Sequence, residues 1–85
     1  MMDAQGRSFG FVVGSDVQRD GMYYEATEIV GGKSTFVAEV FYSDQSHSMT
    51  FTAVVPDIPI EIIDHMLEQA RIRLVPIGHP AKVAE

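Results

Sequence analysis

The chain has 85 residues, and 12 acidic side chains outnumber 6 basic ones to give a formal net charge of −6. This length suits one hydrophobic core rather than two, and the absence of cysteine excludes disulfides, thiolate metal ligands and a thiol nucleophile. The acidic balance argues against binding to nucleic-acid backbones or anionic membranes. Because the start is not a signal peptide and no apolar run reaches the roughly 18 residues of a membrane span, we expect a cytoplasmic protein.

Four segments alternate apolar and polar side chains with period two, and turn residues bound each of them. Their content of β-branched and aromatic residues is typical of strands. Gly10 and Gly14 weaken the first segment as a strand. The predicted strands cover residues 8–14, 22–30, 35–43 and 48–55.

The glycine pair at positions 31 and 32 determines the register of the second and third strands. A two-residue loop would put Ala26 opposite Val37 and set the two apolar faces on opposite sides of the sheet. The alternation of side chains along the strands (their parity) therefore excludes this loop. A three-residue loop, residues 30–32, restores parity and gives Gly32 the left-handed backbone that such loops require. A four-residue loop, 44–47, then joins the third and fourth strands. The predicted pairs are Ala26 with Phe36, Tyr24 with Ala38, Met22 with Val40, Val40 with Phe51, Ala38 with Ala53 and Ser43 with Ser48.

A helix is predicted from Ile58 to about Leu74, where apolar residues recur at helical spacing. Asp57 suits the N-cap position, and Pro59 suits the first turn, where its missing N–H costs nothing. Pro76 ends the helix.

Three alanines leave a shallow trough on one face of the predicted sheet, and the helix can lie in it. The sequence therefore predicts an α+β fold, an antiparallel β-meander of three to four strands with one C-terminal helix packed on one face. We expect a single domain over residues 1–85, with its core in about 8–76 and a flexible tail over 77–85. The alanines of the trough are Ala26, Ala38 and Ala53.

The face of the predicted sheet that points away from the helix carries many large apolar side chains. A sheet covered on one side usually shows polar side chains on its other face, whereas here threonines and two glutamates are interspersed with apolar groups. Contiguous apolar patches of this kind mark interaction sites. The alternatives are single exposed residues, or a cover formed by the first strand or the tail. The predicted interaction surface consists of Tyr23, Ile29, Val37, Phe41, Val54, Glu25 and Glu39.

The sequence contains no pattern typical of a catalytic, cofactor or metal site. The spacing of His47, His65 and His79 predicts no metal centre, and no serine lies in a nucleophile elbow. His65 follows Glu61 by four residues, so we expect a favourable contact between the two on a solvated helix face. A weak cation site that adds Asp64 and Glu68 is the alternative.

Two functions fit these observations. The first is a protein-interaction or regulatory module, homodimeric and non-enzymatic, whose outer sheet face binds a protein partner or a second copy. The second is a small-ligand binder or enzyme that uses Glu25, Glu39 or the Glu61–His65 pair in a cleft completed by oligomerisation. The order of strands followed by a helix resembles double-stranded-RNA-binding domains, but the helix has no lysine cluster and no helix precedes the strands. That resemblance concerns layout and implies no activity.

Overall fold

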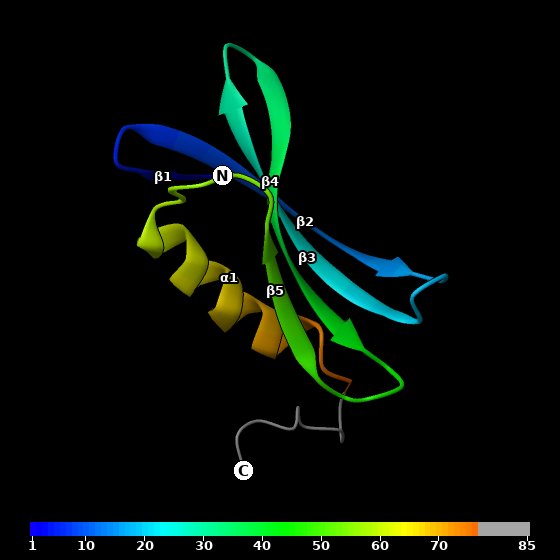
Figure 1. Ribbon diagram of the computed structural model, residues 1–85. Helices are drawn as coiled ribbons and strands as arrows, with labels where there is room; N and C mark the ends of the chain where they lie inside the picture. Colours follow the sequence, from blue (N-terminus) through cyan, green and yellow to red (C-terminus); the bar gives the residue numbers. More distant parts are fainter. Residues whose placement is uncertain (77–85) are drawn as a thin grey trace.

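A computed structural model describes residues 1–76 of the chain. Within these residues five antiparallel strands form one sheet in sequential order, and a single helix lies across one side of it (Figure 1). The sheet is twisted and curls toward the helix (Figure 1). The expected tail and His79 lie outside the described residues. The elements are β1 (Met2–Ala4), β2 (Arg7–Asp16), β3 (Gly21–Val30), β4 (Lys33–Ser43), β5 (Met49–Ala53) and α1 (Ile60–Arg73).

The predicted α+β fold, an antiparallel meander with a helix on one face, is confirmed, and the structure adds a fifth strand, β1. Gln5 and Gly6 join β1 to β2 and both have positive φ, 54° and 74°. A two-residue hairpin loop needs such angles because its twist must match that of the strands. β2 also runs longer than predicted, to Asp16, despite its two glycines. Within residues 1–76 no helix is long and apolar enough to cross a membrane.

The predicted three-residue loop between β3 and β4 is wrong. Val30 pairs with Lys33, so the loop has two residues, Gly31 and Gly32, and both have positive φ. Parity is restored by a β-bulge instead of a longer loop. The bulge is one extra residue on β4, Val37, between the Ala26–Ala38 pair and the pair that follows it. The observed pairs include Tyr24 with Val40, Ala26 with Ala38, Glu25 with Glu39 and Thr27 with Phe36.

The bulge exchanges the environments of two neighbouring side chains. Val37 was expected on the outer face, but it is 1 % exposed and belongs to the core. Phe36 was expected in the core, but it is 38 % exposed. Because of the extra residue, every side chain of β4 between the bulge and the loop lies on the face opposite to the one predicted. The predicted inner face of β4 is therefore correct from Ala38 to Tyr42 and wrong at Phe36 and Val37, which lie on the loop side of Ala38.

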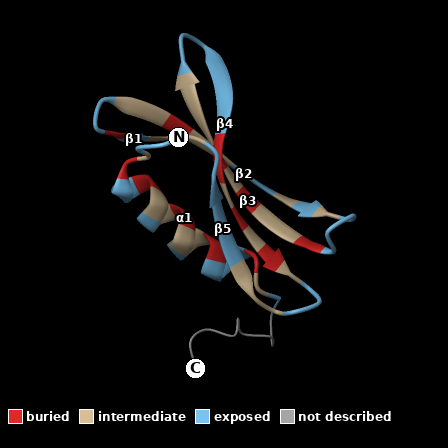
Figure 2. Cartoon of the chain, in the orientation of Figure 1, coloured by how far each residue is buried: buried red, intermediate tan, exposed pale blue. Residues whose placement is uncertain are grey.

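The register of β4 and β5 is as predicted, but α1 leaves β5 largely exposed. Val40 pairs with Phe51 and Ala38 with Ala53. The main contacts of α1 are with β1, β3 and β4, so Phe51 and Ala53 remain exposed on the edge of the sheet. Figure 2 shows that the buried residues gather in the middle of the sheet and on the side of α1 that faces it.

The helix begins later than predicted, and its N-cap is Pro59, which makes no side-chain capping hydrogen bond. Asp57, the predicted N-cap, has a φ of 59° in the preceding loop. Its backbone oxygen accepts a 2.7 Å hydrogen bond from Arg7 Nη1. The other guanidinium nitrogens of Arg7 donate to both carboxylate oxygens of Glu28 at 2.9 Å, and these hydrogen bonds hold the pKa of Glu28 below its ordinary value. This Arg7 clamp therefore joins β2, β3 and the loop that leads into α1.

Ala38 lies at the centre of the core, so we expect the substitution Ala38→Leu to lower the free energy of unfolding. Ala38 is 0 % exposed and faces Ala26 on one side and Ala53 on the other. Added methylene groups in a packed core cost about 1–3 kcal/mol. Urea denaturation followed by circular dichroism measures the effect. Ala53→Leu is the control in the same row, and its exposed site should leave the midpoint nearly unchanged. Equal midpoints for wild type and Ala38→Leu would refute this packing.

Candidate functional site

The outer face of the sheet, the side away from α1, contains most of the predicted interaction surface. Tyr23, Glu25 and Ile29 of β3 and Glu39 and Phe41 of β4 alternate onto it, while Val37 is buried beneath it. Val54 is 53 % exposed just beyond the end of β5. The observed register places Tyr23 directly opposite Phe41, whereas the predicted pair of Tyr24 with Ala38 would put Glu39 opposite Tyr23.

Two aromatic side chains on the outer face lie against glycines. A Cβ built on Gly14 would collide with the ring end of Tyr23, and one built on Gly21 would collide with the ring of Phe41. The missing side chains leave room for the rings to cover the backbone of the sheet. Tyr23 and Phe41 are therefore half-buried although no element of residues 1–76 covers this face.

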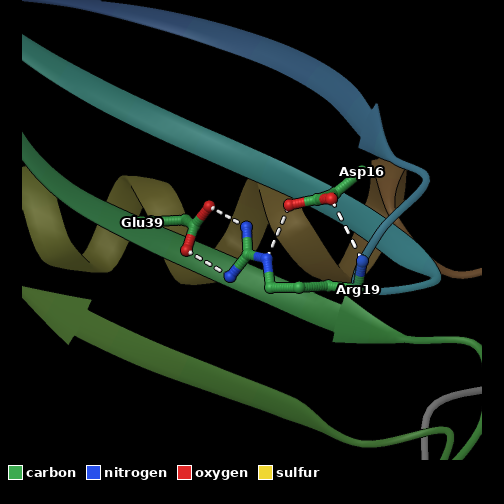
Figure 3. A network of polar contacts seen from close by, with 3 residues as sticks. All are labelled: Asp16, Arg19 and Glu39. Atoms are coloured by element: carbon green, nitrogen blue, oxygen red, sulfur yellow. Dashed lines mark hydrogen bonds and ion pairs between the residues drawn. The ribbon is translucent and has the colours of Figure 1, made fainter.

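Arg19 links two acidic side chains on the same face, Asp16 and Glu39, into one cluster (Figure 3). Its terminal nitrogens donate to the two carboxylate oxygens of Glu39 at 3.1 and 2.7 Å, and its Nε donates to Asp16 at 2.6 Å. The guanidinium carbon lies 4.1 Å from the ring centroid of Phe41, a cation–π contact. The hydrogen bonds from Arg19 hold the pKa of Asp16 below its ordinary value. Arg19 thus satisfies Glu39 and covers part of Phe41.

Glu25 lies opposite Glu39 and takes no part in this cluster. Like charges directly across two strands repel each other, and Arg19 neutralises one of them. In the described part of the chain the carboxylate of Glu25 has neither a hydrogen-bond partner nor an ion-pair partner. Glu25 therefore leaves an unbalanced negative charge in the middle of the outer face, beside Val12, which is its partner on β2.

An open cleft of about 540 Å³ lies on the opposite side of the sheet, between α1 and β2. It exists because α1 packs mainly over β3, β4 and β1 and leaves part of the inner side of β2 uncovered. No acidic side chain of residues 1–76 lines it. The lining residues are Met1, Met2, Phe11, Val13, Tyr24, His65, Gln69 and Arg73.

Three rings form the inner wall of this cleft. Phe11 stacks on Tyr24 with ring centroids 5.5 Å apart, and the His65 ring lies 4.6 Å from Phe11. Tyr24 Oη and His65 Nε2 are 3.2 Å apart. Burial raises the pKa of Tyr24, and Arg73 only partly offsets the shift, so the phenol stays protonated. This hydrogen bond links the phenol of β3 to the imidazole of α1 across the inner wall of the cleft.

The helix residues that the sequence singled out do not come together as expected. His65 does not pair with Glu61, because it turns toward Tyr24. Glu61 accepts a 3.1 Å hydrogen bond from Gln5 Nε2 instead. No group of three or more His, Cys, Asp or Glu side chains within residues 1–76 could hold a metal ion. Glu25 and Glu39 lie on the other side of the sheet, so they share no cleft with His65.

The sequence contained one signal for the cleft. His65, Gln69 and Arg73 recur every four residues, next to the buried stripe of Ile62, Met66 and Ala70. Known proteins add nothing to this geometry, since no family model, curated protein or solved structure matches the chain. The candidate sites are therefore the outer face and the cleft.

Proposed function

We propose that the chain is a protein-interaction module whose outer face docks a basic, partly apolar surface of another protein. The observation that carries the proposal is the row Val12, Glu25, Glu39 and Thr52, which crosses four neighbouring strands. Val12 is 50 % exposed, and Glu25 next to it has no counter-ion in the described residues. A partner with a cation beside an apolar side chain would satisfy both groups.

Self-association is the second candidate, because Val12 and Phe36 expose apolar surface on the same face as the Tyr23–Phe41 pair. Burial between two copies would add to the small core of an 85-residue chain. Charge opposes it, since two copies would bring like carboxylates together at −6 per chain. Salt screens that repulsion within about 8 Å at physiological ionic strength.

Salt dependence separates these two candidates. Binding to a basic partner weakens as salt rises, whereas self-association strengthens. Sedimentation equilibrium of the wild type at low and high salt, with Val12→Glu as the comparison, measures self-association. A wild type that stays monomeric at high micromolar concentration in both salts would rule out the homodimer.

The basic partner is tested with a fluorescently labelled peptide of alternating lysine and leucine, whose binding is followed by anisotropy. We expect Glu25→Gln to weaken binding about fivefold, as the loss of one charge pair of about 1 kcal/mol implies. Glu68→Gln on the exposed side of α1 removes the same charge far from the outer face and should leave binding unchanged. If both variants weaken binding equally, the peptide senses only net charge and the proposed surface is wrong.

A further inference from the structure

The charge of the cleft between α1 and β2 is opposite to that of the whole chain. The protein carries 12 acidic side chains, yet none of those in residues 1–76 lines the cleft, and a guanidinium, that of Arg73, does. Polar groups gather on its helix side and apolar groups on its strand side. A ligand that complements both sides of the cleft has an apolar group and a negative charge.

Arg73 has donors to offer to such a ligand. Its Nε donates to Gln69 Oε1 at 3.1 Å, one helical turn earlier, which orients the guanidinium. Its terminal nitrogens have no acceptor among residues 1–76, unlike those of Arg7 and Arg19. A guanidinium with both terminal nitrogens available matches the two oxygens of a carboxylate.

The strand side of the cleft suits a flat ring. Phe11 and Val13 are only partly covered by the rest of the chain, and Phe11 is already held in place by stacking on Tyr24. Aromatic rings favour such stacked or tilted contacts at centroid distances of about 4.5–7 Å. The imidazole of His65 adds a polar edge to the same wall. The volume of about 540 Å³ lies within the usual range for small-molecule sites, roughly 300–1,000 Å³.

We propose that this cleft binds a small planar organic acid, with its ring against Phe11 and Val13 and its carboxylate on Arg73. The site lies on the other side of the sheet from the outer face. It is thus a second binding site, and neither proposal depends on the other.

The test uses 2-naphthoate, whose own fluorescence reports binding to a chain that contains no tryptophan. We expect saturable binding of 2-naphthoate. The uncharged 2-naphthylmethanol should bind about tenfold more weakly, because it lacks the charge-assisted hydrogen bonds, and acetate, which lacks the ring, should not compete. Arg73→Gln should weaken 2-naphthoate binding about tenfold and leave 2-naphthylmethanol binding unchanged.

Arg71→Gln is the matched control. Arg71 also lies in the last turn of α1, so its loss changes the net charge and the helix terminus in the same way, but it does not line the cleft. The Arg71→Gln variant should bind 2-naphthoate with the same affinity as the wild type. Val13→Glu, which adds a carboxylate to the strand wall, should abolish binding, and urea midpoints will show that each variant is folded. Equal weakening by Arg71→Gln and Arg73→Gln, or no saturable binding to the wild type, would overturn the proposal.

Discussion

Replacement of Gly21 by alanine is expected to destabilise the chain by more than about 3 kcal/mol, beyond the usual range for overpacking. Gly21 is buried at the start of β3, opposite Ser43. A Cβ there would overlap the backbone oxygen of Tyr42 and the ring of Phe41. The ring could rotate away, but the backbone oxygen belongs to a strand that is paired on both sides. Guanidinium denaturation followed by circular dichroism measures the loss.

Gly14→Ala is the matched control on the neighbouring strand. Its Cβ would meet only the outer end of the Tyr23 side chain, which can move into solvent. Alanine also loses less backbone entropy on folding than glycine, a gain of roughly 0.5–1 kcal/mol in a strand. The free energy of unfolding should therefore stay within about 1 kcal/mol of the wild type. Equal losses for the two variants would show that the Tyr42 backbone is not the cause.

The second large effect is expected from Val37→Asp, because it places a carboxylate in the core. Val37 is 1 % exposed, and a buried charge without a partner costs about 3–5 kcal/mol. Phe36→Asp changes the neighbouring residue, which is 38 % exposed, and should cost about 1–2 kcal/mol from lost apolar contact. Urea midpoints of the two variants compare the sites directly. The reverse order would mean that β4 has no bulge and that the loop has three residues.

The bulge also shows where prediction from sequence stopped. Period-two alternation, turn residues and helical spacing were enough for the α+β meander and for the register of β4 and β5. Parity showed that the hairpin at Gly31 and Gly32 needed one more residue, but that residue can enter the loop or the strand. Both Phe36 and Val37 are apolar, so the pattern of side chains could not decide. β1 was missed because three residues, Met2–Ala4, are too few to show a period.

Prediction from sequence likewise succeeded for one candidate site, the outer face, and failed for the other, the cleft. Alternation along β3 and β4 was sufficient to place Tyr23, Glu25 and Phe41 on the outer face. The cleft depends on which strands the helix covers, and side-chain packing determines that, not spacing along the chain. His65 lies beside both the buried and the solvated side of α1, so its sequence position fitted a pair with Glu61 as well as a contact with Tyr24.

The Arg7 clamp has a consequence for the order in which the chain folds. Every strand pairs with the next one along the chain, so the sheet can assemble hairpin by hairpin with little loop-closure entropy to overcome. The hydrogen bond from Arg7 to the Asp57 backbone, by contrast, spans 50 residues. It can form only after the meander has brought β2 near the loop that leads into α1. We infer that helix docking is a late event in folding and an early one in unfolding, and that the walls of the cleft separate before the sheet opens.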